Sequence, residues 1–548
     1  MRRFTLLAAL LALAACAQPP KPGDSGTVTF LTMNDVYRIE GVDGGTAGGI
    51  ARLATLRQEL AATDADLIVL HAGDFLYPSL LSRSYDGQQM IDVLNRIDGD
   101  PAGFDERFFV TFGNHEFDKS SLKDAALLDA RVEESQFTWL GSDIDFAEGA
   151  QGQTLVAAPN LAERALLDAN GVTVGIFSLT ADIKHPEYVT AFADPLEVAR
   201  AQTAALRAAG AELVVALTHQ AAEEDAALLA ALGDAGPDLV IGGHEHIRMQ
   251  RESAGRYIVK ADADLRTAAV VTVKPRQGRA PLVAVSFLAL AGENPAPDPA
   301  VTAAVEDWLK RQDAEYCAVS YKLPPGCLDA PLGKAAVTLV AEEIEIRKYE
   351  TNLGDWVLDQ ALAALAPEGA QIAFLNAGSL RLNQNLAAGT VITRRHLDEL
   401  FAYANDLRLI RVSGAMLQQM IERSVEDWTG NGWFLQIAGF AWRFDPATGK
   451  VGDLTLLTPQ GPRPIAPDDE LLAVTNDFLT DPKFGQDGYT MLTPDRLVPI
   501  ARKMPSLRDL VIEALGQAGP EGIAPAVDGR ICNSLRPGPC LALPAVGS

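Results

Sequence analysis

Positive charge is scarce in this sequence. Its 548 residues include 46 lysines and arginines against 72 aspartates and glutamates, so the formal net charge is -26 at pH 7. A surface this acidic repels phosphate backbones and argues against nucleic acid as a polymeric partner. A small anion can bind only where metal ions or arginines reverse the local charge.

Long apolar segments are lacking beyond the first sixteen residues. Two arginines precede the run FTLLAALLALAA, which is too short to cross a bilayer and is typical of a signal peptide. The run ends in Leu13-Ala14-Ala15-Cys16, which resembles the bacterial lipobox; an ordinary signal peptide cleaved after a small residue is the alternative. We expect residues 1–16 to be a lipoprotein signal peptide with its acceptor Cys16, and residues 17–26 a flexible tether. The predicted protein is exported and lipid-anchored to a bacterial membrane, facing the periplasm or the cell surface.

Cysteine is also rare, with four residues besides Cys16. In an exported chain four cysteines suggest two disulfides. The simplest of the three connectivities joins near neighbours, Cys317 with Cys327 and Cys532 with Cys540. Free buried thiols are the alternative, and zinc binding is disfavoured because neither pair has a histidine nearby.

Histidine occurs only seven times, and four of these residues follow apolar, β-branched segments between residues 27 and 292. Five such segments end in polar side chains, and the stretches between them, such as 48–65 and 194–211, have helical spacing of apolar residues. Alternating strands and helices indicate a layered α/β domain over 27–292, with both faces of a single sheet covered. Ligands of such folds bind at the carboxyl ends of the strands, so we expect these ends to meet at one rim. The side chains there are Asn34, Asp35, Asp74, Asn114, His115, His219, His244 and His246.

These motifs resemble those of the calcineurin-like metallophosphoesterases. The stretch GGIAR at 48–52 also resembles the 5′-nucleotidase subgroup, which includes UDP-sugar hydrolases and 2′,3′-cyclic phosphodiesterases. The match covers nearly all of the mature chain. The other matching stretches are Asp35, Gly73-Asp74, the GNHEFD of 113–118, His219 and the GGHEH of 242–246.

The resemblance implies a site for two divalent metal ions of the manganese, zinc or cobalt type. Asp74 would bridge both ions. His115 would face the substrate phosphate, oriented by Asp118, while Glu116 is expected to point away as a solvated or structural residue. His71, on the opposite face of its strand from Asp74, is expected in the core or behind the ligands. The remaining ligands would be Asn114, His219 and His244 for one ion, and Asp35 and His246 for the other.

One position departs from the family pattern. The family has D-x-H after the first strand, with the histidine as a metal ligand, whereas this chain has Asp35-Val36-Tyr37. A phenol, with an ordinary pKa of about 10, is a poor ligand at neutral pH unless the metal displaces its proton. Three interpretations stay open: water completes the site, Tyr37 itself coordinates, or the first metal is lost. We predict weakened metal affinity at the Asp35/His246 site only.

The second half of the chain resembles the smaller α+β C-terminal domain of 5′-nucleotidases. Residues 293–333 read as a linker, with a helix over 300–316 and a loop, and 334–548 as the substrate-binding domain. Matching stretches are R-x-x-E-x-N-x-G at 347–354, an N-G-G-x-x-R variant at 376–381, an altered P-F-x-N at 402–405, and loops at 476–478 and 485–489. We expect the arginines to bind anionic oxygens and an aspartate to hold a ribose hydroxyl. Two aromatic rings would stack a nucleobase, with Phe484 and Tyr489 as alternatives to Phe478. The predicted substrate contacts are Arg347, Asn376, Arg381, Tyr403, Phe478 and Asp487.

The function predicted from these features is removal of phosphate from nucleoside 5′-monophosphates outside the cytoplasm, with no obligate protein partner. A UDP-sugar pyrophosphatase or a 2′,3′-cyclic phosphodiesterase would use the same metal core. A thiosulfohydrolase-like enzyme would too, but the arginines and aromatics favour nucleotides. Tyr37 motivates an alternative of another class, a nucleotide-binding surface lipoprotein with weakened catalysis.

Overall fold

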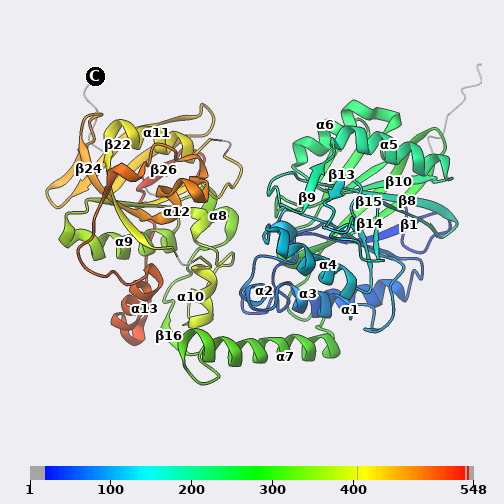
Figure 1. Cartoon of the computed structure of the whole chain (residues 1–548), viewed down its shortest axis with the longest axis horizontal. Helices are drawn as coiled ribbons and strands as arrows, with labels where there is room; N and C mark the ends of the chain where they lie inside the picture. The colour runs from blue at the N-terminus through cyan, green and yellow to red at the C-terminus, as the bar shows by residue number, and fades with distance from the viewer. Residues whose placement is uncertain (1–18, 404, 427, 537–539, 542–548) are drawn as a thin grey trace, which may run out of the picture. The chain divides into compact units, whose positions relative to one another are not determined.

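The computed structural model describes residues 19–403, 405–426, 428–536 and 540–541. The predicted signal peptide and Cys16 lie outside these residues. The chain divides into two compact units, one ending at Trp308 and one beginning at Leu309 (Figure 1). The division falls inside helix α7 (Pro299–Tyr316), which is the helix expected in the linker. None of the helices in the described part is both long enough and apolar enough for a membrane span.

The first unit contains two large sheets and a two-stranded one, β5 (Ile144–Phe146) with β9 (Val189–Phe192), so the prediction of a single sheet is wrong. The larger has the strand order β15-β14-β1-β2-β3-β4-β6, and the smaller β12-β13-β11-β10-β8-β7. The larger sheet comprises β1 (Val28–Met33), β2 (Ile68–His71), β3 (Phe108–Thr111), β4 (Thr138–Leu140), β6 (Leu161–Ala162), β14 (Thr267–Arg276) and β15 (Arg279–Ala289). The smaller comprises β7 (Arg164–Ala169), β8 (Val172–Thr180), β10 (Leu213–His219), β11 (Leu239–Gly242), β12 (Met249–Ser253) and β13 (Arg256–Lys260).

The two sheets pack face to face, with helices on the outer faces. Val215 and Leu217 of β10 join a core that also holds Phe30 of β1 and Leu70 of β2. Their neighbour Val214 points the other way and packs with residues of α5 (Pro195–Ala208) and α6 (Ala222–Leu232). Figure 1 shows the remaining helices of the unit on its opposite side: α1 (Ile50–Ala61), α2 (Leu80–Tyr85), α3 (Gln88–Leu94) and α4 (Ala125–Glu134).

This arrangement explains why the apolar pattern misled the single-sheet prediction. A strand between a second sheet and a helix is buried on both faces, as is a strand between two helix layers. Both environments produce the same continuous apolar runs. The strands β1, β2 and β3 are nevertheless parallel neighbours, as are β10 and β11, so their carboxyl ends share an edge within each sheet.

The second unit is an α+β mixture, as predicted. A five-stranded sheet has the order β20-β17-β24-β19-β25, and a four-stranded sheet the order β23-β22-β21-β26. The strands are β16 (Pro331–Lys334), β17 (Ile372–Asn376), β18 (Val391–Thr393), β19 (Leu407–Ser413), β20 (Leu435–Ala438), β21 (Phe440–Asp445), β22 (Lys450–Thr458), β23 (Gly461–Pro464), β24 (Glu470–Asn476), β25 (Leu497–Val498) and β26 (Ile531–Asn533). The helices are α8 (Glu343–Lys348), α9 (Asn352–Leu365), α10 (Arg394–Leu400), α11 (Gly414–Ser424), α12 (Asp477–Thr480) and α13 (Leu507–Gln517).

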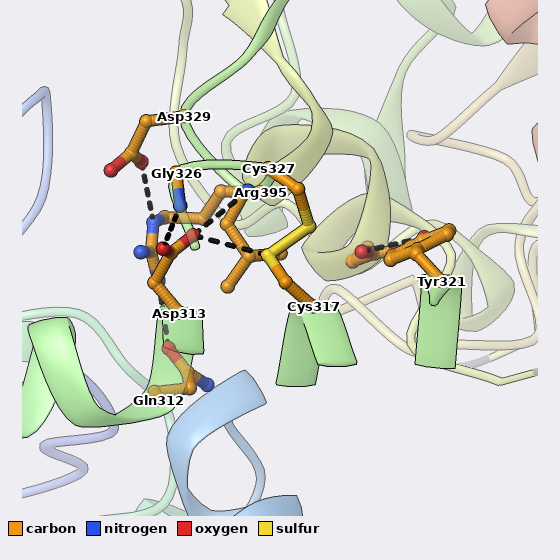
Figure 2. Close-up of a disulfide and its surroundings, with 10 residues drawn as sticks. Gln312, Asp313, Cys317, Tyr321, Gly326, Cys327, Asp329 and Arg395 are labelled. Atoms are coloured by element: carbon orange, nitrogen blue, oxygen red, sulfur yellow. Dashed lines mark hydrogen bonds and ion pairs between the residues drawn. A yellow bond between two sulfur atoms is a disulfide. The ribbon is translucent and has the colours of Figure 1, made fainter. Parts of the chain in front are cut away.

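Both predicted disulfides are confirmed, Cys317–Cys327 and Cys532–Cys540. The first follows the end of α7 (Figure 2). The buried carboxylate of Asp313 accepts hydrogen bonds from the backbone N–H groups of Gly326 and Leu328. The disulfide and Asp313 therefore tie the end of this helix to the loop that follows it.

Candidate metal centre and active site

The ends of five strands from two different sheets supply the predicted metal ligands, with Asn114 following β3. Asp35 follows β1 and Asp74 follows β2, while His219 ends β10 and His244 follows β11. Asp35, Asp74, His244 and His246 all have positive φ angles, between 53° and 88°. Non-glycine residues adopt this conformation rarely, and it costs free energy that persists mainly at functional sites. The chain therefore turns sharply at these residues.

Three predicted ligands form a compact group. One ligand atom each from Asp35, Asp74 and His246 lies within 4.8 Å of the other two. Asp35 Oδ1 is 3.1 Å from His246 Nε2, and its Oδ2 accepts hydrogen bonds from Asn34 Nδ2 and from the backbone N–H of His244. The Asp35 carboxylate therefore holds the loop that carries both histidines.

The other predicted ligands join this group through Asp74. His219 Nε2 lies 3.2 Å from Asp74 Oδ2, and the His219 and His244 ring centroids are 5.3 Å apart. His244 Nδ1 lies 3.2 Å from Asn114 Oδ1. All six predicted ligands are thus brought together, although no single sheet carries them.

The tautomer of His219 indicates that a cation belongs between these groups. Its Nδ1 donates to the carbonyl oxygen of Ala72 at 2.7 Å, so Nε2 holds the lone pair in the neutral ring. Nε2 is buried without a hydrogen-bond partner and faces the carboxylate of Asp74. Two electron-rich atoms at this distance repel unless a proton or a metal ion lies between them. The donor set of carboxylate, imidazole and amide oxygen fits borderline divalent ions.

The electrostatics of the centre lead to the same conclusion. Burial disfavours the charged imidazole of His219, but Asp74 and Asp35 outweigh it and raise its pKa to about 9. Burial and the neighbouring His219 lower the pKa of His244 to about 4. Burial alone would raise the pKa values of Asp35 and Asp74, yet nearby histidines hold both below the ordinary range. Two buried carboxylates thus require positive charge at this point.

Glycines allow the loops to approach closely. A Cβ atom on Gly113 would lie 2.2 Å from Asp74 Oδ1, and one on Gly243 would lie 2.6 Å from the carbonyl oxygen of Ala72. Real Cβ atoms do not approach other atoms so closely, so the glycines of the GNHE and GGHEH motifs are sterically required.

His115 lies beside the ligands and is paired with Asp118. Its Nδ1 is 2.9 Å from Asp118 Oδ2, and its backbone N–H donates to Asp74 Oδ1 at 2.7 Å. Burial alone would raise the pKa of Asp118, but His115 and Lys184, whose Nζ is 2.8 Å from Asp118 Oδ1, hold it well below its usual range. The arrangement leaves His115 Nε2 to meet a substrate. Lys184 lies in a loop outside every motif, so nothing in its sequence spacing could have identified it.

Glu116 was expected to point away as a solvated or structural residue, but the structure shows that it is buried and not solvated. Only 1% of the residue is exposed. Its Oε2 accepts from the backbone N–H groups of Asp74 and Gly113, and its Oε1 from those of Phe75 and Leu76, at 2.6–3.0 Å. The carboxylate thus fixes the loop that carries Asp74. His71 is fully buried against the ring of Phe75, in the core as expected.

A second buried ionic group supports the GGHEH loop and was missed by sequence reasoning. Lys260 Nζ contacts Glu245 Oε2 at 2.7 Å, Asp225 Oδ2 at 3.1 Å and the carbonyl oxygen of Gln220 at 2.7 Å. Glu245 lies between His244 and His246. Lys260 therefore acts on that loop from behind the ligands.

In the second unit, part of the predicted substrate set forms one network. Asn376 Nδ2 donates to Asp487 Oδ2 at 2.8 Å. Burial raises the pKa of Asp487, while Asn376 and the positive charges of Arg381, Arg423 and Arg347 oppose the rise. Arg347 Nη2 also pairs with Glu343 at 2.5 Å. The predicted arginines thus lie near the predicted ribose-binding aspartate, with some donors already used.

The aromatic predictions separate into exposed and buried rings. Tyr403 is 48% exposed and stacks 5.5 Å from the Arg381 guanidinium. Phe478 is half-buried and lies parallel to the exposed Phe484, with centroids 6.4 Å apart. Tyr489 is fully buried and donates its hydroxyl to the carbonyl oxygen of Trp433, which excludes it as a stacking ring.

Comparison with known proteins matches each half of the chain to a separate family model. Residues 28–248 match calcineurin-like phosphoesterase, and residues 331–494 match the 5′-nucleotidase C-terminal domain. The 5′-nucleotidase of Diplobatis ommata is 24% identical over 92% of this chain and 89% of its own length. The trifunctional nucleotide phosphoesterase protein YfkN of Bacillus subtilis is 24% identical over 87% of this chain, which spans only 33% of that relative. The crystal structure of a 5′-nucleotidase precursor from Thermus thermophilus shares the fold, with a TM-score of 0.73 at 24% identity over 93% of this chain and 100% of that one.

Proposed function

Because the chain belongs to the calcineurin-like metallophosphoesterases that carry a 5′-nucleotidase C-terminal domain, we propose that it hydrolyses nucleoside 5′-monophosphates. It is a metal-dependent phosphoric ester hydrolase that uses two divalent ions. The observation that carries the proposal is the convergence of six ligand-type side chains beside the His115–Asp118 pair.

In this proposal, Asp35, Asp74 and His246 hold one ion. Asn114, His219 and His244 hold the other, with Asp74 shared. Bound ions supply Lewis-acid chemistry by neutralising phosphoryl oxygens and lowering the pKa of an attacking water.

The protein side chains position the ester and handle its proton. Asp118 fixes the tautomer of His115, so that Nε2 can donate a proton or a hydrogen bond to a phosphate oxygen. Glu116 keeps Asp74 in place through the backbone of its loop. Lys184 maintains Asp118 as an anion.

The nucleoside is assigned to the C-terminal domain, residues 334–548, and the phosphate chemistry to residues 27–292. Arg347, Arg381 and Asn376 would meet anionic or sugar oxygens, and Asp487 a ribose hydroxyl. Tyr403 and Phe478 would stack the base, an interaction worth about 1–3 kcal/mol. The exposure of Tyr403 supports its part in this assignment.

The proposed setting is outside the cytoplasm, with Cys16 as the lipid attachment point. The two disulfides support an oxidising compartment. Nucleotides there cannot cross a membrane readily until phosphate is removed, so salvage is the natural purpose.

Hydrolysis of AMP, UMP, UDP-glucose and a 2′,3′-cyclic nucleotide, with and without Mn²⁺, tests the proposal. The products are separated by chromatography, because cleavage of UDP-glucose or of the cyclic nucleotide frees no inorganic phosphate. The expected result is Mn²⁺-dependent release that is fastest with a monophosphate. His115→Ala should lower turnover by about 10²-fold or more. His185→Ala, which removes a histidine side chain that is 72% exposed, is the matched control.

Each competing function has its own outcome in this assay. Preference for UDP-glucose or for the cyclic nucleotide would favour the corresponding diesterase activity. Nucleotide binding without release in any metal would favour a non-catalytic binding lipoprotein. An unchanged rate in His115→Ala would remove that residue from the mechanism.

A further inference from the structure

Tyr37 reaches into the predicted ligand group from the loop after β1. The residue is only 6% exposed, and its backbone N–H donates to Asp264 Oδ1 at 2.9 Å, which fixes the start of the side chain. Its hydroxyl oxygen lies 3.3 Å from Asp35 Oδ1, 3.3 Å from Asp74 Oδ2 and 3.0 Å from His246 Nε2. The phenol oxygen thus contacts all three members of the group that binds one ion in the proposed function.

These distances decide between two roles for the hydroxyl. Metal–oxygen and metal–nitrogen bonds of about 2.0–2.2 Å place neighbouring ligand atoms about 3.0–3.6 Å apart, depending on whether the angle is octahedral or tetrahedral. The three separations from the Tyr37 oxygen fall in this range, as does the 3.1 Å between Asp35 Oδ1 and His246 Nε2. A hydroxyl oxygen in the place of the ion would contact each ligand atom at about 3 Å, and the surrounding ligand atoms would then be about 4 Å or more from one another. Asp35 Oδ1 and His246 Nε2 are only 3.1 Å apart. The hydroxyl therefore stands at a ligand position and leaves room for the ion.

The single proton of the phenol favours the same role. A phenol has one proton, whereas the two carboxylate oxygens beside it are acceptors only. The single hydrogen could serve both carboxylates only as a shared bond, and 3.3 Å is long for a hydroxyl hydrogen bond. A cation bound within the group would turn every one of these contacts into an ordinary separation between ligands.

We propose that Tyr37 is a metal ligand of the first site, taking the position that a histidine has in the D-x-H pattern. The inference rests on the proposed function, because it concerns one of the same two ions. On binding, the metal–oxygen bond replaces the O–H bond of Tyr37, and the proton leaves to solvent without any change of oxidation state. Of the three interpretations open from the sequence, this selects direct coordination.

Coordination by Tyr37 has a chemical consequence for metal choice. An anionic phenolate oxygen replaces a neutral imidazole nitrogen. The first site therefore gains negative charge and prefers harder metal ions. The second site keeps His219, His244 and Asn114 and is unaffected. The two sites should therefore differ in selectivity more than they would with a histidine at position 37.

Zinc titration of metal-free protein tests this assignment without reference to activity. Zn²⁺ has a filled d shell and no absorption of its own, so a new near-ultraviolet phenolate band reports tyrosine coordination. The expected result is two zinc ions per chain by elemental analysis and a band equal to one phenolate. Tyr37→Phe should lose the band and bind the first-site zinc at least about tenfold more weakly.

Two further variants keep the test decisive. Tyr77→Phe is the matched control, because Tyr77 is equally buried at 6% exposure but its hydroxyl lies 3.5 Å from Asp86; it should keep both the band and the affinity. Tyr37→His should bind two zinc ions without the band, which shows that the site remains folded.

The outcomes separate this inference from the proposed function. Two tightly bound zinc ions without a phenolate band, or a band that persists in Tyr37→Phe, would overturn the role of Tyr37 and leave the two-metal hydrolase standing. Fewer than two zinc ions in the original chain, restored to two in Tyr37→His, would also overturn it and show that Tyr37 disables the site. Fewer than two in every variant would count against both proposals.

Discussion

Substituting Glu116 by glutamine tests how the Asp74 loop is held in place. The carboxylate accepts four backbone N–H groups, two on each oxygen, from Gly113 and from three successive residues beginning at Asp74. Glutamine has nearly the same shape but replaces one oxygen by an NH₂ group, which donates and cannot accept. In either orientation of the amide, two buried N–H groups lose their acceptor and face a donor.

The cost can be estimated from these contacts. A buried donor left without its partner costs about 1–3 kcal/mol, so two cost about 2–6 kcal/mol. The two bonds that remain also lose the strength that a charged acceptor gives them. Against a typical unfolding free energy of about 5–15 kcal/mol, the substitution should visibly destabilise the unit that contains the loop.

Urea unfolding of metal-free Glu116→Gln, followed by circular dichroism, measures the effect. Glu133→Gln is the matched control, since Glu133 is an exposed glutamate of α4. The first variant should unfold at a clearly lower urea concentration with the same slope. It should also bind zinc more weakly, because Asp74 is the shared ligand in the proposed function. Equal midpoints and zinc affinities in both variants would refute the role assigned to Glu116.

Three further perturbations follow from the described contacts. Chelation of bound metal should lower the thermal midpoint, equivalent to about 2.7 kcal/mol if metal was present at one hundred times its dissociation constant, and Mn²⁺ should restore it; an unchanged melting curve would contradict a metal centre. The paired change Cys317→Ala/Cys327→Ala should lower the free energy of unfolding in urea by about 2–3 kcal/mol, because it opens a loop of ten residues. An unchanged free energy of unfolding would show that the hydrogen bonds of Asp313 alone hold the loop. Asp64→Asn should flatten the acid limb of the stability curve. Burial alone would raise the pKa of Asp64, but hydrogen bonds from Asn170 and from the backbone N–H groups of Gly23 and Asp66 hold it below its usual value. Its contribution to stability is therefore present above about pH 4 and lost as pH falls through the folded pKa. Identical acid curves for Asp64→Asn and the original chain would refute this reasoning.

The ligand positions could be predicted from the sequence because strand ends carry a local signal. The apolar runs stop within a residue or two of where the structure ends the strands, and polar residues at or just after those ends form the centre, as at Asp35 and His219. The number of sheets had no such signal, because burial on both faces gives the same pattern beside a helix or beside a second sheet. The site is nonetheless assembled, since both sheets present their carboxyl ends to one place.

The supporting residues could not be predicted because their partners are distant and include backbone groups. Glutamate is rarely buried unless paired, so a solvated Glu116 is the ordinary expectation. Its partners include N–H groups some forty residues earlier in the chain, and side-chain spacing says nothing about those groups. Lys260 likewise meets Asp225 and Glu245 only after three separate elements have packed.

Tyr37 shows most clearly how sequence and structure answer different questions. The sequence shows that a phenol stands where an imidazole is expected, and this leaves coordination, replacement by water and loss of the ion all open. A phenol extends further from the backbone than an imidazole, so its oxygen could have filled the place of the ion. Its distances of 3.0–3.3 Å to three ligand atoms, two of which are themselves only 3.1 Å apart, instead put that oxygen at a ligand position. The distances between these atoms, rather than the type of residue, therefore decide whether a tyrosine in place of the histidine removes a metal site or changes which metal it prefers.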